Sequence, residues 1–229
     1  MIELKKICKL YDEKIVLKDI SCSFENGNVY SLIAPNGTGK TTLISILSGL
    51  LMQTSGNIVY SENSSSKDSY IVLAGEKNLY TKNTVKENSF YIGRIKGKTT
   101  KEICDKTEFL KKRFPIYNEL FNTVVEKLSF GQKRLIALLN AIIADSQCII
   151  MDEVSEGLDI THIAMLVDMI DFMKKDRIII LASHDYDFVS DVSDFNWFMK
   201  NGEIVQMYGR TSKDEIIACY KKLYEQSEV

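Results

Sequence analysis

The feature that most constrains this chain is a glycine-rich stretch between an apolar segment and an amphipathic one. Residues 28–33 (NVYSLI) are apolar like a buried strand, and residues 34–42 read APNGTGKTT. Apolar residues then recur at helical spacing up to Gly49. The stretch matches the pattern G-x-x-x-x-G-K-[ST], except that Ala34 replaces the first glycine. Backbone N–H groups and the start of a helix make such a loop a phosphate site, so the stretch predicts a nucleotide-binding α/β fold.

The residues of this segment, which we call the glycine loop (residues 34–42), have separate chemical tasks. Gly37 and Gly39 let the backbone approach phosphate without an intervening Cβ atom. Lys40 can reach the β- and γ-phosphates, and the Thr41 hydroxyl can ligate Mg²⁺. Ala34 adds one methyl group at the hinge of the turn and leaves the cradle unchanged. We expect a bound nucleotide to be held by Asn36, Gly37, Thr38, Gly39, Lys40, Thr41 and Thr42.

Strand and helix patterns alternate along the rest of the chain. Residues 2–8 and 15–24 alternate like half-buried antiparallel strands. Further apolar strands are expected at 54–60, 70–75, 147–151, 177–183 and 195–200, with helices at 135–144, at 161–175 and after Ser212. This alternation predicts an α/β core with a mostly parallel sheet and an N-terminal antiparallel β subdomain.

The middle of the chain is helical and charged from about residue 84 to residue 127, with a break at Pro115. We interpret it as an α-helical subdomain inserted into the core. The chain is then a single domain, residues 1–229. Its core comprises residues 1–75 and 140–229, and its helical subdomain about residues 76–139.

Composition narrows the classes of function. The chain has 229 residues and a formal net charge of −2, which gives no reason to expect nucleic acid as a partner. No apolar run approaches the roughly 20 residues that span a bilayer, and the N-terminus lacks the apolar stretch of a signal peptide. We therefore expect a cytoplasmic protein. The five cysteines form no C-x-x-C pair, which speaks against structural zinc.

Two acids follow an apolar strand in QCIIMDE (residues 147–153). Asp152 is expected beside bound Mg²⁺, and Glu153 on the opposite pleat. Adjacent acids at the end of a buried strand are costly unless they face a polar site. A strand end that simply reaches solvent is the better explanation of these acids alone, but their position downstream of the glycine loop favours a site.

His184, one of only two histidines, ends another apolar strand in LASHD (residues 181–185). A lone histidine is usually structural. Ligand sites of α/β proteins nevertheless collect at the carboxyl ends of strands, which makes His184 a candidate site residue. His162 lies on an amphipathic helix and is expected to pack or to be solvated.

The segment LSFGQ (residues 128–132), directly before an apolar helix, points to a family. It resembles the signature LSGGQ of ATP-binding cassette (ABC) ATPases, with Phe130 for one glycine. The order AxxxxGKT, LSFGQ, IIMDE, GLD, SH makes the resemblance specific, and it covers nearly the whole chain. It implies a P-loop NTPase core and the ATPase subunit of a transporter, most like bacterial drug or lantibiotic export cassettes.

The resemblance also implies how the site is shared. ABC cassettes pair head to tail, with two ATP molecules between the glycine loop of one and the signature of the other. Ser129, Gly131 and Gln132 would therefore serve the ATP of a second cassette. Asp159 of the GLD turn (residues 157–159) would lie at the dimer seam.

Further roles follow from the same resemblance. Tyr11 matches the aromatic residue that stacks on adenine. Glu153 would polarise the attacking water, and His184 would contact the γ-phosphate. With Lys40, these two form the expected catalytic set, while Thr41 and Asp152 would hold the metal.

The chain departs from the family after the strand at residues 70–75. ABC cassettes usually carry a glutamine there that touches Mg²⁺ and senses the transporter, whereas this chain has Gly75 followed by Glu76. Either Glu76 replaces the amide or a further water completes the metal shell. This departure bears on turnover and coupling, not on ATP binding.

Three classes of function remain open. In the leading one, the chain binds and hydrolyses ATP for a separate transmembrane permease subunit, docked between Gly75 and about Arg94, at the inner face of the cell membrane. The second cassette would be a copy of the chain or a different one. The alternatives are a soluble ABC ATPase without a transport role, such as an assembly factor, and an ATP-gated switch with weak hydrolysis. The hydrolysis residues Lys40, Asp152, Glu153 and His184 place the switch third.

Overall fold

The computed structural model describes residues 1–61, 65, 68–73 and 78–225. The strands are β1 (Ile2–Tyr11), β2 (Lys14–Phe24), β3 (Val29–Ile33), β4 (Ser55–Tyr60), β5 (Ser69–Val72), β6 (Cys148–Asp152), β7 (Ile178–Ala182), β8 (Phe195–Lys200) and β9 (Glu203–Tyr208). The helices are α1 (Lys40–Leu47), α2 (Val85–Ile95), α3 (Thr100–Arg113), α4 (Pro115–Leu120), α5 (Phe130–Ile143), α6 (Ile160–Met173), α7 (Tyr186–Val192) and α8 (Lys213–Tyr224), with a 3-10 turn at Val125–Lys127.

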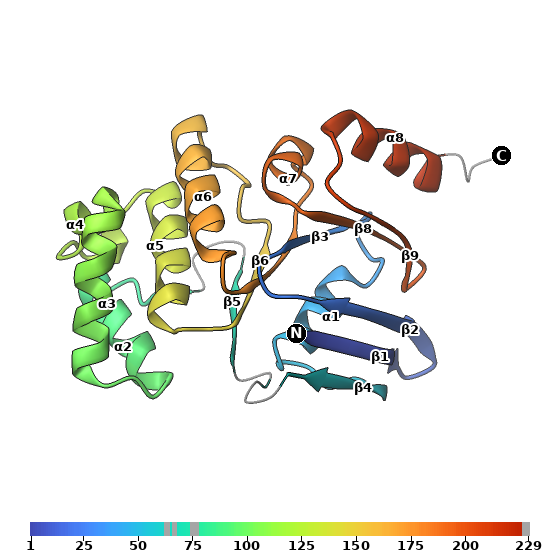
Figure 1. Cartoon of the computed structure of the whole chain (residues 1–229), viewed down its shortest axis with the longest axis horizontal. Coiled ribbons are helices and arrows are strands. Elements are labelled where there is room, and N and C mark those ends of the chain that lie inside the picture. The colour runs from blue at the N-terminus through green and yellow to red at the C-terminus, as the bar shows by residue number, and fades with distance from the viewer. Residues whose placement is uncertain (62–64, 66–67, 74–77, 226–229) are drawn as a thin grey trace.

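A six-stranded sheet in the order β5-β6-β7-β3-β8-β9 forms the centre of the molecule (Figure 1). All neighbouring pairs are parallel except β8 and β9, which form an antiparallel hairpin. Side chains of a strand alternate between the two faces of a sheet. Val29 and Ile33 of β3 accordingly lie in a core with α5 and α6, while Tyr30 and Leu32 lie in the core on the other face.

The second sheet is antiparallel, in the order β2-β1-β4. Helix α1 lies between it and the six-stranded sheet (Figure 1), and Leu43 and Ile44 of α1 share one buried cluster with residues of both sheets. The predicted fold class, an α/β P-loop NTPase core with an N-terminal antiparallel β part and inserted helices, is confirmed.

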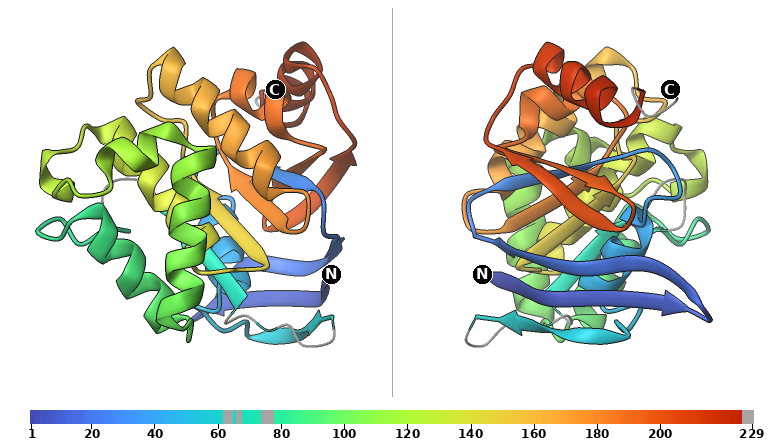
Figure 2. Two further views of the ribbon diagram at one scale, coloured as in Figure 1. Left: turned by 60° about the vertical axis from the view of Figure 1, so that its left-hand side comes forward. Right: turned by 90° about the vertical axis from the view of Figure 1, so that its right-hand side faces the viewer.

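Helices α2, α3 and α4 form a group at one side of the molecule and pack through α5 onto the core (Figure 2). Capping boxes begin α2 at Thr84 and α3 at Thr99, and Pro115 begins α4, as a proline at the first helical position favours. The expected break at Pro115 is confirmed. The subdomain boundaries at about residues 76 and 139 stay a prediction.

Two elements have no counterpart in the sequence-based expectations. Helix α7 is short, and β9 follows β8 through a turn at Asn201 and Gly202, which have φ angles of 52° and 79°. Asn-Gly is a strong signal for a two-residue hairpin, so β9 could have been predicted.

Gly75 and Glu76, to which the sequence assigned the departure from the family pattern, lie outside the described residues.

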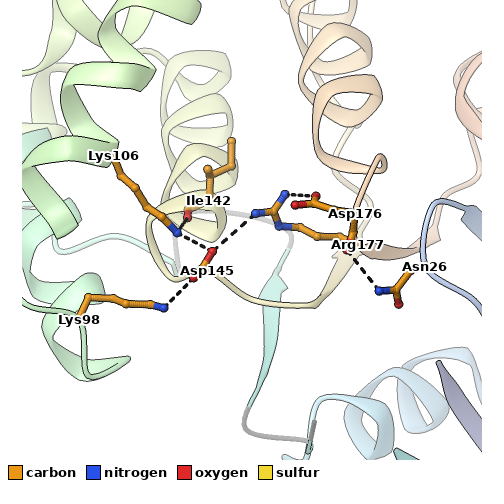
Figure 3. A network of polar contacts seen from close by, with 7 residues as sticks. All are labelled: Asn26, Lys98, Lys106, Ile142, Asp145, Asp176 and Arg177. Carbon is orange, nitrogen blue, oxygen red and sulfur yellow. Dashed lines mark hydrogen bonds and ion pairs between the residues drawn. The ribbon is translucent and has the colours of Figure 1, made fainter. Parts of the chain in front are cut away.

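Asp145, between α5 and β6, connects the helical group to the core (Figure 3). Its carboxylate lies 2.7 Å from Nζ of Lys98, which precedes α3, and 2.5 Å from Nζ of Lys106 within α3. Arg177, directly before β7, approaches the same carboxylate to 3.7 Å. Three cations from three segments therefore meet one carboxylate at the junction of α5 and β6.

The environment of Asp145 shifts its acidity. Partial burial by itself raises the pKa of this carboxyl, but the hydrogen bonds and charges of Lys106 and Lys98 outweigh burial and lower the pKa to about 2 from its ordinary 3.8. A depression of this size corresponds to roughly 2.5 kcal/mol. Because the Asp145 side chain is 37% exposed, solvent screening reduces the expected contribution to about 1 kcal/mol.

We predict that Asp145→Asn lowers the free energy of unfolding at pH 7 by about 1 kcal/mol, because three cations lose their counter-charge. A carboxyl whose folded pKa is depressed stabilises the fold above its unfolded pKa. The difference between wild type and variant should thus be complete above about pH 5 and vanish as the pH falls toward 2. Urea unfolding across this range measures it. Glu126→Gln, which breaks an exposed pair with Lys82, is the control and should change little.

Candidate functional site

The glycine loop leaves β3 at Ile33 and enters α1 at Lys40, which is the order that the sequence predicts. The Lys40 side chain is buried and turns back across the loop. Its Nζ donates to the carbonyl oxygens of Ala34 at 2.5 Å and of Pro35 at 3.1 Å. The Thr38 hydroxyl also donates to the Pro35 carbonyl, at 2.8 Å. Ala34 therefore contributes a backbone acceptor, which alanine supplies as well as glycine.

Gly37 and Gly39 both have positive φ angles, of 80° and 105°, but their surroundings differ. A Cβ atom on Gly39 would lie 2.8 Å from Cδ2 of Leu17 and 2.9 Å from the carbonyl oxygen of Val16. A Cβ atom on Gly37 would meet no described atom within 4 Å. Gly39 is thus required by close contact with β2, whereas Gly37 borders open space above the loop.

A pocket of about 370 Å³ opens above the loop. Most of the residues predicted to bind or cleave nucleotide line it. Val16 also lines it, and no sequence pattern identifies Val16 as a site residue. The lining residues are Tyr11, Val16, Asn36, Gly37, Gly39, Lys40, Thr41, Thr42, Asp152 and Glu153. The ring of Tyr11 is about half exposed, and the Lys9 ammonium lies 5.1 Å from its centre.

Asp152 and Glu153 reach this pocket from the end of β6. The backbone N–H of Glu153 donates to the Ala182 carbonyl at 2.9 Å and so prolongs the pairing of β6 with β7. The expectation that Glu153 would lie on the opposite pleat is wrong. Its φ angle of 49° takes the backbone into the left-handed region, so the strict alternation of a strand ends at Asp152 and both acids line one pocket.

His184 follows β7 and lies at the edge of the site. Its Nε2 is 3.3 Å from Oδ1 of Asn36 and 3.6 Å from Oε1 of Glu153. Its backbone N–H donates to Oε2 of Glu153 at 3.2 Å. His184 does not line the pocket itself, but it contacts two residues that do. His184 therefore lies beside the pocket and is exposed, so it is not a core residue.

Burial sets the electrostatics of the pocket. It raises the pKa of the Asp152 carboxyl, which the charges of Lys40, Arg134 and His184 oppose. It also raises the pKa of Glu153, where the hydrogen bond from His184 N–H is the leading opposing effect. Burial lowers the pKa of Lys40, and the charges of Glu153 and Asp152 oppose this shift. A carboxylate with a raised pKa is a better proton acceptor, which is the property needed of a general base.

The donor set fits a metal–triphosphate ligand. Thr41 offers a hydroxyl and Asp152 a carboxylate, and Mg²⁺ prefers such oxygen ligands together with phosphate oxygens. The approach of β2 leaves no room for a Cβ on Gly39, while the space at Gly37 admits a ligand close to the backbone. The residues present therefore suit phosphate above the loop and a divalent cation that Thr41 and Asp152 would hold.

The signature segment (residues 128–132) forms a second cluster that does not line this pocket. Ser129 caps α5 in a capping box: its Oγ accepts from Gln132 N–H at 3.2 Å, and Gln132 Oε1 accepts from Ser129 N–H at 2.9 Å. Gly131 packs on His162, where a Cβ would lie 2.8 Å from the ring. Asp159 caps α6 and holds that ring, with Oδ2 2.8 Å from Nδ1 of His162. The signature segment and the GLD turn therefore meet within one chain.

Phe130 and Arg134 complete this cluster. Phe130 is exposed, and the Arg134 guanidinium lies 5.0 Å from its ring centre. Arg134 is otherwise buried, and its Nη1 donates to the Leu73 carbonyl at 2.7 Å. Burial lowers the pKa of Arg134. Sequence reasoning missed Arg134, although a charged residue on an otherwise apolar helix face was a signal for it.

Comparisons with known proteins agree with this geometry. The family model for ABC transporters matches residues 17–156. The chain is 31% identical over 208 residues to the ABC transporter ATP-binding protein NatA of Bacillus subtilis, covering 86% of this chain and 84% of that protein. It is 26% identical over 214 residues to the lantibiotic transport ATP-binding protein SrtF of Streptococcus pyogenes, covering 90% and 89%.

A solved structure extends the likeness to the whole fold. Protein cbiO1 of Clostridium perfringens, part of the ABC transporter complex cbiONQ, superimposes with a TM-score of 0.81 at 25% sequence identity. The match covers 98% of this chain and 93% of that one. It includes α7 and α8, which lie beyond the residues matched by the family model.

We predict that alanine at the two loop glycines has unequal effects on stability. Both variants force a positive φ angle on a residue with a side chain, which costs about 1–2 kcal/mol. Gly39→Ala adds a collision with the Val16 carbonyl, so its total loss should be about 3 kcal/mol or more. Urea unfolding measures both. Equal losses in the two variants would contradict the role assigned to the contact with β2.

The contact between Gly131 and His162 generates a second prediction. Gly131→Ala should lower the free energy of unfolding by about 1–2 kcal/mol, because the added methyl pushes the imidazole off the Asp159 carboxylate. In a His162→Ala background the same change should be neutral or stabilising, since alanine is the better helix former. Thermal or urea unfolding of the four proteins of this cycle measures the coupling. A Gly131→Ala effect of the same sign and size in both backgrounds would contradict the contact.

Proposed function

The chain belongs to the ABC transporter family, and on this premise we propose that it binds and hydrolyses ATP to power an ABC exporter. The observation that carries the proposal is the convergence of Lys40, Asp152 and Glu153 on one pocket above the glycine loop. Likeness to a lantibiotic transport protein supports a role in transport, and export is the direction that we propose. Coupling to transport follows from membership of the family, in which ATP hydrolysis drives movement of a substrate.

In the proposed mechanism, the backbone of the glycine loop binds the phosphates and Lys40 extends to them from its place beneath the loop. Thr41 and Asp152 would hold Mg²⁺, which would neutralise phosphate charge when bound. Tyr11, exposed at the rim, stacks on the base. Glu153 orients a water and accepts its proton, for which the raised pKa suits it. His184 holds the Glu153 carboxylate through its backbone N–H and presents its ring to the γ-phosphate.

A second cassette completes the site in this proposal. Ser129, Gly131 and Gln132 do not line the pocket of their own chain. Ser129 begins α5, so the N-terminal end of that helix is available to the phosphates of another chain. Head-to-tail pairing would bring the two clusters together. Asp159, held by His162, would then lie at the seam.

The proposed permease contact is a groove of about 470 Å³ lined by residues that follow α1, by β5 and by α2. Tyr80 and Tyr91 line it with their hydroxyls 2.8 Å apart, and the exposed Leu50 and Ile95 line it as well. Such a groove suits a short amphipathic helix from a membrane subunit. Within the part of the chain that the structure describes, no helix has the length and apolar character needed to cross a membrane.

The test is Glu153→Gln, which keeps the shape of the side chain and removes its basicity. We expect ATP binding to persist and hydrolysis to fall by about 10²–10⁴-fold. With ATP held uncleaved, the variant should elute as a dimer from a sizing column. Lys40→Ala should bind ATP weakly and remain monomeric. A Glu153→Gln protein that stays monomeric at every ATP concentration would show either that the sandwich is wrong or that a different cassette is required.

A further inference from the structure

Tyr224, the last residue of α8, joins that helix to the strand that leads into the glycine loop. Its hydroxyl oxygen lies 2.7 Å from the carbonyl oxygen of Met199 and 3.3 Å from that of Ile33. A phenol has only one proton to donate. The hydroxyl therefore donates mainly to the Met199 carbonyl, at the shorter distance, and the Ile33 carbonyl shares the same proton. Ile33 and Phe198 are the last paired residues of β3 and β8. The hydroxyl therefore lies where the pairing of these strands ends.

The next carbonyl along the chain belongs to the nucleotide site. Ile33 O faces Tyr224, and Ala34 O accepts the hydrogen bond from Lys40 Nζ. The hydroxyl of α8 and the ammonium of the proposed phosphate-binding lysine thus contact consecutive carbonyls. Ala34 is 1% exposed and packs in the core beneath α1, so its backbone is constrained from that side as well.

Helix α8 is itself fixed at both ends. Ser212 and Glu215 form a capping box at its start, and Lys213 pairs with Asp187 of α7 at 2.7 Å. Near its end, Lys200 of β8 donates to the Leu223 carbonyl at 2.6 Å. Tyr224 is therefore held in place by bonds that do not involve its own side chain.

The same helix contacts the turn that carries His184. The Tyr224 ring is 4.6 Å from the Tyr220 ring, which is 5.8 Å from the Tyr186 ring, centre to centre. Tyr186 lies two residues after His184 and begins α7. Three aromatic rings thus run from the end of β3 to the His184 turn.

We propose that Tyr224 is a positioning residue for the glycine loop. Its hydroxyl fixes the Ile33–Ala34 peptide and, through it, the Ala34 carbonyl that accepts from Lys40. The inference rests on the proposed function in taking nucleotide as the ligand of the loop. The family model matches only residues 17–156, so this role comes from contacts of this chain and not from the shared motif.

The test compares Tyr224→Phe with Tyr220→Phe. Tyr224→Phe removes only the oxygen that bonds to Ile33 and Met199. The Tyr220 hydroxyl has no hydrogen bond to any residue within 1–61, 65, 68–73 and 78–225, so its removal is the matched control. Amide hydrogen exchange over residues 33–43, measured without nucleotide, reports the loop directly. The dissociation constant for Mg-ATP, from calorimetry, reports its effect on binding.

We expect Tyr224→Phe to speed exchange in residues 33–43 by about three- to tenfold and to weaken Mg-ATP binding by a similar factor, while kcat at saturating ATP stays within about twofold. Tyr220→Phe should match the wild type in both measurements. Exchange and affinity in Tyr224→Phe equal to wild type, with only a lower melting temperature, would overturn the inference. If the wild-type chain fails to bind Mg-ATP, the proposed function fails, and the exchange measurement still decides the role of Tyr224.

Discussion

The parallel pairing of β3, β7 and β6 is the constraint on which the site depends. Leu32 of β3 and Asp152 of β6 both pair with Ala182 of β7, so the three strands end in one row. The glycine loop, Glu153 and His184 each follow this row within two residues. Because side chains alternate along a strand, a slip of one residue in β6 would turn Asp152 to the other face. The apolar side chains of these strands, buried on both faces, hold that register.

Keeping the charged groups of the site partly buried costs free energy. Burial disfavours the charged forms of Asp152, Glu153 and Lys40 alike, as the directions of their pKa shifts show. Their mutual attraction offsets part of this cost. Backbone groups also contribute: the His184 N–H donates to the Glu153 carboxylate, and the Ala34 and Pro35 carbonyls accept from Lys40. Charged groups kept partly dehydrated interact more strongly with a ligand than they would in water.

Sequence reasoning was strongest where local pattern and chemistry coincide. Gly39, Lys40 and Thr41 are identified by spacing alone, since the loop is built from neighbouring residues. The orientation of Glu153 was missed because a left-handed residue can follow a strand without a glycine to mark it. The Asn201–Gly202 pair favours a hairpin and is the local signal for β9. No local pattern predicts that Tyr224 bonds to Ile33 or that Arg177 approaches Asp145, because the partners are far apart in sequence and meet only through the fold.

The position of Asp145 has a mechanical consequence for α5. This helix begins at the signature segment and ends just before Asp145, whose carboxylate is held by cations from both the helical group and the core. Its 14 residues make a rod of about 21 Å, with one end fixed and the other carrying Ser129. Tilting such a rod by about 10° about the fixed end would carry Ser129 through roughly 4 Å. Because Asp145 lies at the fixed end of this rod, any tilt of α5 about that end would displace the signature segment most.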